Sequence, residues 1–249
     1  MIQDLHVHSC FCDGRDEPEE IVKSAIDKGI GKLGIVTHSY TFFDRSYCIP
    51  EDKVKVFIET INALKEKYRD EITLLCGVEQ DYYSDHPTDG FDYVIGSVHY
   101  LKRNRIYYPI DESREDFLRM VNEGFSGDFH AMAEEYYSLE SDVVKKTGAD
   151  IIGHFDLITK FNEGDCLFDT GCGRYVEAWK GAVDRLIQHD VPFEINTGAI
   201  SKGYRKTPYP APDIIEYIKQ KKGRLLLSSD AHSKDTLSYR FEDFGYLIK

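Results

Sequence analysis

The chain has 249 residues and a formal net charge of −13, and 41% of its residues are hydrophobic. This content is typical of a globular protein and excludes a disordered chain. The negative charge argues against a nucleic-acid surface or an anionic membrane as partner, but bound divalent cations would still permit an anionic substrate. The chain starts without a basic, apolar leader and has no apolar run of membrane-spanning length, so we expect a cytoplasmic protein.

Strand-like and helix-like segments alternate along the chain, without internal repeats or a long linker. The first apolar alternation, Ile2, Leu5 and Val7, predicts a short strand that carries His6 and His8 on one side. Six further apolar runs predict strands at 33–37, 72–78, within 90–98, 151–153, 191–195 and 225–229.

Most connections between these strands show helical spacing of their apolar residues. Pro18 suits the start of the first helix, which should end before Gly29. A polar, aromatic segment without predicted regular structure runs from 100 to about 128. A long helix is expected from 129 to 143, with Gly148 as its stop. The other predicted helices cover 57–68 and 176–186, and one opens at 208–212.

Continuous apolar strands are buried on both faces, as in parallel sheets covered by helices. We therefore expect an α/β barrel of about seven strands, in one domain over residues 1–249. The alternative is a doubly wound open sheet. Against it, no Gly-x-Gly-x-x-Gly opens a helix after the first strand.

Each predicted strand ends in a residue that can bind a metal or a substrate. In a barrel the carboxyl ends of parallel strands face one rim, so these residues would converge there. Nitrogen and oxygen ligands without thiolate suit Zn²⁺, Mn²⁺ or Fe, and their number exceeds what one ion needs. We predict two to three divalent transition metal ions, with Glu79 as the bridging carboxylate. The strand-end residues are His6 with His8, His38, Glu79, His99, His154, Asn196, and Asp230 with His232.

Together, these segments resemble the polymerase and histidinol-phosphatase (PHP) family, and most of all its histidinol-phosphatase branch. The resemblance covers nearly the whole chain, with the motifs in the right order. The motifs are Asp4-Leu5-His6-Val7-His8-Ser9, Thr37-His38-Ser39, Gly77-Val78-Glu79, Gly96-Ser97-Val98-His99, Gly153-His154-Phe155-Asp156-Leu157, Glu194-Ile195-Asn196-Thr197 and Ser229-Asp230-Ala231-His232.

The resemblance implies a distorted (β/α)₇ barrel and a trinuclear metal centre. The third metal would use a residue of the first loop, where the family often has a histidine and the nearest candidate in this chain is Asp13. The first metal would be held by His6, His8, Glu79 and Asp230, the second by Glu79, His99 and His154, and the third by Asp13, His38 and His232.

For the reaction, we hypothesise that a hydroxide bridging two metals attacks phosphorus in line with the leaving oxygen. Glu79 would hold the two metals together. The leaving alkoxide would receive a proton from Asp230, His232 or a metal-bound water, and the sequence leaves these three open. Asn196 is expected either to contact the substrate or to support a ligand from behind.

The phosphate also needs cationic partners. The candidates are Lys160, Lys202 and Arg205, with Ser201 as a further contact. Each of the three cations could equally be a solvated surface charge. The branch usually carries arginines in patterns like Gly-His-x-Asp-Leu-x-Arg and Asn-Thr-x-x-x-Arg-Lys. This chain has Thr159 and Ser201 at those places, and a neighbouring lysine does not replace a bidentate arginine.

The leading function is metal-dependent phosphomonoester hydrolysis, with histidinol phosphate converted to histidinol and phosphate in histidine biosynthesis. A second reading is a PHP phosphoesterase for another small ester, such as a nucleotide or a sugar phosphate. A third is a non-catalytic metal-binding accessory module, against which the nearly full ligand set argues. The aromatic residues Tyr100, Tyr107 and Tyr108 are expected to wall the pocket or to pack over the barrel. The sequence pattern does not indicate an oligomeric state.

Overall fold

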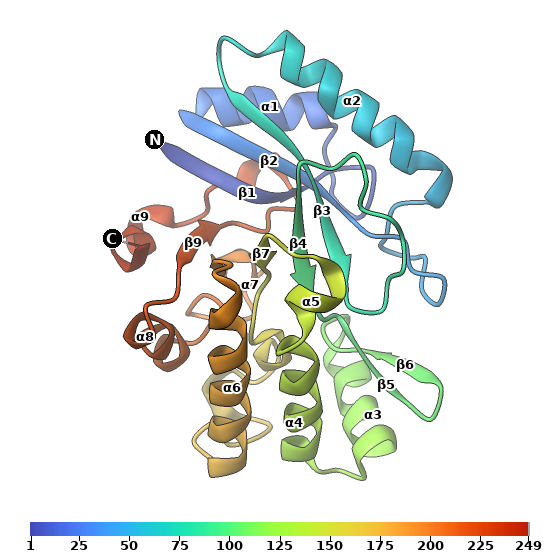
Figure 1. The fold of residues 1–249 in the computed structure, drawn as a ribbon, viewed down its shortest axis with the longest axis vertical. Helices are drawn as coiled ribbons and strands as arrows, with labels where there is room; N and C mark the ends of the chain where they lie inside the picture. The colour runs from blue at the N-terminus through green and yellow to red at the C-terminus, as the bar shows by residue number, and fades with distance from the viewer. Residues whose placement is uncertain (249) are drawn as a thin grey trace.

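The computed structural model describes residues 1–248, and its central feature is a seven-stranded sheet. Every strand pair in this sheet is parallel, and the spatial order of the strands follows their order in the chain (Figure 1). The strands are β1 (Ile2–His8), β2 (Ile30–His38), β3 (Thr73–Asp81), β4 (Tyr93–Ser97), β7 (Ile151–Ile152), β8 (Phe193–Asn196) and β9 (Leu225–Ser228).

The sheet curves until its first and last strands approach each other. Val7 on β1 forms an isolated parallel bridge with Ala231, which follows β9. The backbone N–H of His8 donates to the carbonyl of Ala231 at 2.8 Å, and the N–H of Ala231 donates to His6 at 3.2 Å. The result is a nearly closed barrel, so the predicted distorted (β/α)₇ barrel is confirmed. The doubly wound alternative is wrong, because the strand order shows no reversal.

Helices cover the outside of the barrel. In Figure 1, α1 and α2 lie along β1 to β3, and α3, α4 and α6 form a second group at the other end of the view. Among residues 1–248, no helix has both the length and the apolar character needed to span a membrane. The helices are α1 (Pro18–Asp27), α2 (Val54–Lys67), α3 (Arg114–Phe125), α4 (Phe129–Glu140), α5 (Val143–Thr147), α6 (Gly173–Leu186), α7 (Gly198–Ser201), α8 (Pro212–Gln220) and α9 (Phe241–Phe244).

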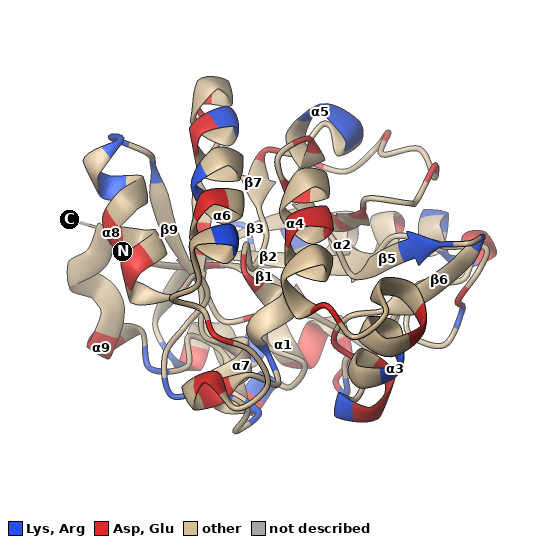
Figure 2. Ribbon diagram, turned by 90° about the horizontal axis from the view of Figure 1, so that it is seen from below, with Lys and Arg blue, Asp and Glu red and all other residues tan. Residues whose placement is uncertain are grey.

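The surface of these elements carries both charges. Figure 2 shows Asp and Glu positions, coloured red, along α4 and α6 and on several loops, with Lys and Arg positions, coloured blue, interspersed among them. This distribution agrees with the net charge of −13.

The Tyr93 side chain packs inside the barrel and explains why positions 34 and 77 are glycines. A Cβ added at Gly34 would lie 2.0 Å from the Tyr93 hydroxyl, and one at Gly77 would lie 2.4 Å from the same ring. The Tyr93 hydroxyl donates to the carbonyl of Leu5 at 2.5 Å. The ring therefore packs directly on the backbones of β2 and β3, where only glycine leaves room.

The segment 100–128 contains regular structure that the sequence pattern did not predict. β5 (Tyr100–Arg103) and β6 (Ile106–Pro109) form an antiparallel hairpin, and α3 follows it. The hairpin turn places Asn104 and Arg105 at positive φ, 51° and 69°. Such turns usually contain Asn-Gly, and the arginine in the glycine position hides the signal.

The long helix expected from 129 to 143 is two helices. α4 ends at Glu140 and α5 begins at Val143. The predicted stop is correct, since Gly148 follows α5 with a left-handed φ of 71°.

Candidate metal centre and substrate cavity

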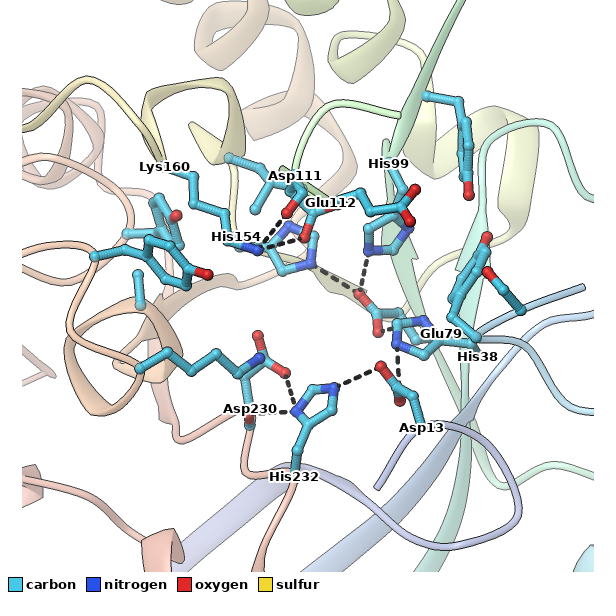
Figure 3. A pocket seen from close by; sticks show the side chains of 18 of the residues that line it. Asp13, His38, Glu79, His99, Asp111, Glu112, His154, Lys160, Asp230 and His232 are labelled. Atoms are coloured by element: carbon cyan, nitrogen blue, oxygen red, sulfur yellow. Dashed lines mark hydrogen bonds and ion pairs between the residues drawn. The ribbon is translucent and has the colours of Figure 1, made fainter. Parts of the chain in front are cut away.

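A cavity of about 570 Å³ opens at the carboxyl ends of the barrel strands. Figure 3 shows imidazoles and carboxylates pointing toward one another across its floor. His6 and His8 lie beneath this floor and are fully buried. The other predicted metal-binding residues line the cavity: Asp13, His38, Glu79, His99, His154, Asp230 and His232.

The barrel brings these residues together because all of them except Asp13, which belongs to the first loop, lie at, near or shortly after the end of a strand. His8 and His38 are the last residues of β1 and β2, and Glu79 lies near the end of β3. Asp230 follows β9 with a left-handed φ of 49°, a conformation that aspartate tolerates better than most residues. A Cβ added at Gly198 would lie 2.9 Å from the Asp230 side chain, so α7 requires glycine at this point of approach.

Glu79 lies at the centre of the cluster and is 1% exposed. Its two carboxylate oxygens face different histidines, as a bridging ligand would require. Oε2 lies 3.1 Å from His6 Nε2, 3.4 Å from His8 Nε2 and 3.1 Å from His38 Nδ1. Oε1 lies 2.8 Å from His154 Nε2 and 3.2 Å from His99 Nε2, and it accepts from Ser97 Oγ at 2.8 Å.

Asp13 of the first loop lies on the other side of His38. Its Oδ2 is 3.1 Å from His232 Nε2, and its Oδ1 is 3.5 Å from His38 Nε2. Ligand atoms of His8, Asp13, His38 and His232 all lie within 4.8 Å of one another. The expected third group therefore converges, with His8 as an additional neighbour.

Two further groups converge in the same way. Ligand atoms of His6, His8 and Glu79 lie together, and so do those of His38, Glu79 and His99. Asp230 Oδ1 is 3.5 Å from His8 Nε2 and 3.8 Å from His6 Nε2.

The donor set fits metal ions better than it fits a hydrogen-bonded core. His6 Nε2 and His8 Nε2 face each other at 3.0 Å, although both side chains are fully buried. Because His6 Nδ1 is within 2.7 Å of a Glu194 carboxylate oxygen, it carries the proton, and Nε2 offers a lone pair. Converging imidazole and carboxylate lone pairs of this kind suit Zn²⁺, Mn²⁺ or Fe.

Opposite charges dominate the electrostatics of this cluster. Burial opposes the ionisation of Glu79, but the imidazoles of His6, His38 and His99 hold the pKa of its carboxyl well below the usual range. Burial also disfavours the charged form of His6, yet the carboxylates of Glu194 and Glu79 raise the pKa of its ring well above the usual range. Protons therefore compete with metal ions for these ligands, and metal binding should weaken in acid.

The sequence-predicted phosphate cations do not all reach the cavity. Lys160 and Lys202 line it. The Lys160 ammonium donates to the carbonyl of Asp111 at 2.5 Å and to its carboxylate at 3.0 Å. The Lys202 ammonium forms no hydrogen bond or ion pair with the described residues 1–248, so it is available to an anionic ligand.

Arg205 requires a correction. Its guanidinium is buried, bonds to Asp156 Oδ2 at 3.2 Å and contacts Thr159 Oγ1. It lines a second cavity of about 220 Å³, together with Thr159. Since the buried Asp156 carboxylate holds Arg205 there, the geometry does not support a phosphate contact by this residue.

Asn196 and Ser201 also lie outside the lining of the main cavity. Asn196 is fully buried, and its amide donates to Glu194 at 3.2 Å and to Asp230 at 3.4 Å, so of its two expected roles the structure favours support of a ligand. The Ser201 hydroxyl donates to the carbonyl of Gly198 within α7 at 2.8 Å.

The cavity wall contains residues that sequence reasoning missed. Arg15 of the first loop is exposed and lines the cavity, as do Asp44, Asp111 and Glu112. They lie in loops without a motif or a strand end to indicate them. Of the aromatic candidates, Tyr100 lines the cavity.

Other aromatic residues support the wall from outside. Tyr107 stacks on Phe43 with ring centroids 3.9 Å apart, which joins the hairpin to the loop after β2. Tyr108 is 3% exposed and packs in the core.

Comparisons with known proteins agree with this arrangement. The model of the PHP domain family matches residues 4–198. The "Probable histidinol-phosphatase" of Schizosaccharomyces pombe is 29% identical over 91% of this chain and 79% of its own length. The "Histidinol-phosphatase" of Bacillus subtilis is 24% identical over 97% of each chain.

A solved structure shares the fold. The histidinol phosphate phosphatase of Lactococcus lactis, crystallised with zinc, L-histidinol and phosphate, aligns with a TM-score of 0.74 at 21% identity. The alignment covers 99% of this chain and 92% of that one.

Proposed function

Because this chain belongs to the PHP domain family, as its motifs predicted, we propose that it is a metal-dependent phosphatase that hydrolyses histidinol phosphate to histidinol and phosphate. The observation that carries the proposal is the convergence of histidines and carboxylates around the buried Glu79, on the floor of an open cavity. Two relatives, aligned over 79% and 97% of their own lengths, bear the names "Probable histidinol-phosphatase" and "Histidinol-phosphatase".

The metal ligands are assigned as the resemblance to the PHP family implies, and the short distances among them support the assignment. We assign two to three divalent ions, zinc, manganese or iron, and the structure of the Lactococcus lactis enzyme with zinc supports the first of these. Bound divalent ions would lower the pKa of water to give hydroxide at neutral pH and would polarise the phosphate. The first ion would use His6, His8, Glu79 and Asp230, the second Glu79, His99 and His154, and the third Asp13, His38 and His232.

Side chains of the cavity would bind the substrate phosphate and assist protonation of the leaving alkoxide. Among residues 1–248, the Lys202 ammonium and the Arg15 guanidinium form no ion pair, and we assign these two cavity-lining charges to the phosphate oxygens. Burial opposes the ionisation of Asp230, but the nearby Lys202 and His6 hold the pKa of its carboxyl well below the usual range. Because a carboxylate with a lowered pKa has no proton to give at neutral pH, the leaving alkoxide would take its proton from a metal-bound water. Asp230 and His232, which line the cavity side by side (Figure 3), would orient that water.

Two carboxylates of the cavity wall favour histidinol phosphate over the other esters. Asp44 and Glu112 line the cavity and form no ion pair within residues 1–248, so they match the positive charge of an amino alcohol, whereas Asp111 is paired with Lys160. A nucleotide or a sugar phosphate brings no such charge. The nearly full ligand set argues against a non-catalytic accessory module.

A panel of phosphorylated metabolites tests the proposal. Metal-loaded protein should hydrolyse histidinol phosphate with a kcat/KM at least about 100-fold above that for a nucleoside monophosphate or a hexose phosphate, since the wall selects a cation. A preference for another ester would overturn the substrate assignment. Absence of turnover on every ester, by protein that has bound metal, would overturn the phosphatase itself.

Chelation provides the second test. Removal of metal should abolish hydrolysis, and addition of Zn²⁺ or Mn²⁺ should restore it. Anomalous scattering from crystals should then place two to three peaks among the assigned ligands. Full activity after complete chelation would contradict the proposal.

A further inference from the structure

The strand β8 contributes no predicted metal ligand, yet two of its side chains reach the metal cluster. Phe193 and Ile195 pack in apolar core clusters, whereas Glu194 and Asn196 alternate with them and share the opposite face. Glu194 is 1% exposed. A carboxylate in the middle of a buried strand is unfavourable unless specific partners compensate for it.

Glu194 has three hydrogen-bond partners, and two of them belong to assigned metal ligands. Its Oε1 accepts from His6 Nδ1 at 2.7 Å. Its Oε2 accepts from the backbone N–H of His154 at 3.1 Å and from Asn196 Nδ2 at 3.2 Å. Among residues 1–248, no lysine or arginine forms an ion pair with it. The carboxylate thus joins β1 to the loop after β7, and its burial is compensated by groups of the site.

These contacts determine how His6 is presented to its neighbours. A carboxylate that accepts from Nδ1 fixes the proton on that nitrogen and directs the Nε2 lone pair to the opposite side of the ring. On that side, His6 Nε2 lies 3.1 Å from Glu79 Oε2 and 3.0 Å from His8 Nε2. Glu194 therefore aims His6 into the cluster while it holds the backbone of a second ligand.

We propose that Glu194 is a positioning residue of the metal centre, which orients the His6 ring and fixes the backbone of His154. This inference rests on the metal centre of the proposed function. A purely structural role for Glu194 would stabilise the fold without altering metal affinity, so the two roles are separable by experiment.

The test compares Glu194→Ala and Glu194→Gln with Glu140→Gln. Glu140 on α4 is an equally buried carboxylate, 0% exposed, which accepts from the Tyr136 hydroxyl at 2.8 Å and, among residues 1–248, forms no hydrogen bond or ion pair with an assigned ligand. Zinc affinity is measured by competition with a chelator, and the absorption spectrum of the Co²⁺-loaded protein reports ligand geometry. Circular dichroism melts report folding.

We expect Glu194→Ala to weaken zinc binding at its tightest affected site by about 10- to 100-fold. Glu194→Gln should weaken it less and alter the Co²⁺ spectrum, because one amide oxygen still accepts while its NH₂ group opposes another donor. Glu140→Gln should retain the zinc affinity and spectrum of the unmodified protein, even if its melting temperature falls.

Two results would overturn the inference. One is unchanged zinc affinity and an unchanged Co²⁺ spectrum in both Glu194 variants. If Glu194→Ala does not fold, the same result in Glu194→Gln alone overturns the inference. The other is an equal loss of zinc in Glu140→Gln, which would assign the effect to core stability. An unmodified protein that binds no metal would instead overturn the proposed function, and it is recognised before any variant is compared.

Discussion

The floor and the wall of the cavity are built in different ways. The floor consists of strand-end side chains such as Glu79 and His154, which are buried and contact one another directly. The wall consists of loop residues such as Arg15, Asp44 and Lys202, which face the open cavity. The barrel backbone holds the first set in place, whereas the second set depends on the conformation of each loop.

This difference separates two tasks of the site. A metal centre needs donor atoms held within narrow limits, and strands supply them. Substrate choice needs charges that differ among relatives, and loops supply these without disturbing the barrel. Changes to the floor should therefore remove catalysis, and changes to the wall should alter substrate affinity first.

His99→Ala gives the sharpest test of the floor. The side chain is 6% exposed and lies 3.2 Å from the central Glu79, so its loss removes an assigned ligand. We expect kcat/KM to fall by at least about 100-fold, with folding retained. His189→Ala, at an exposed position, is the matched control and should behave as the unmodified protein. Near-normal turnover in His99→Ala would show that the floor is assigned incorrectly.

The floor was predictable from the sequence because one geometric rule governs it. Parallel strands end at one rim, so polar residues that follow apolar runs can be predicted to lie close together even when no loop conformation is known. Glu194 escaped this rule since it lies within a strand. Its signal is the alternation of Phe193 and Ile195 with polar residues, which is unexpected in a strand that is buried on both faces.

The wall was not predictable, because the sequence does not say which way a loop side chain points. Lys202 and Arg205 lie close together in the chain, yet Lys202 lines the main cavity and Arg205 pairs with the buried Asp156. Arg15 faces the cavity from a loop that the motifs indicated only through Asp13. The hairpin that carries Tyr100 was missed for a local reason, its arginine-containing turn.

Replacement of the wall cations should have a smaller effect than loss of a floor ligand. Arg15→Ala and Lys202→Ala should each raise KM by about 10-fold and lower kcat less, because each removes one charged contact to the phosphate. Steady-state kinetics on histidinol phosphate measures this. Arg69→Ala, exposed at the end of α2, controls for the loss of surface charge. A larger rise in KM for Arg205→Ala than for either wall variant would refute the division between these cations.

The smallest effect is expected at Asp111, a wall residue whose carboxylate forms an ion pair with Lys160. Burial opposes the ionisation of Asp111, but the Lys160 ammonium lowers the pKa of its carboxyl from 3.8 to about 2. A lowered pKa means that the pair stabilises the fold fully above about pH 4 and that this contribution is lost as the pH falls toward 2. Asp111→Asn should therefore reduce the free energy of unfolding by less than about 1 kcal/mol at neutral pH, since the pair is partly exposed.

Urea denaturation of metal-free protein between pH 7 and pH 2 measures this, with the exposed Asp89→Asn as control. The difference between Asp111→Asn and the unmodified protein should stay constant down to about pH 4 and then shrink toward zero. A difference that does not shrink below about pH 4 would mean that Asp111 and Lys160 form no ion pair. Lys160 would then behave like Lys202, as a cation available to the substrate, and the wall would contain no preformed ion pair.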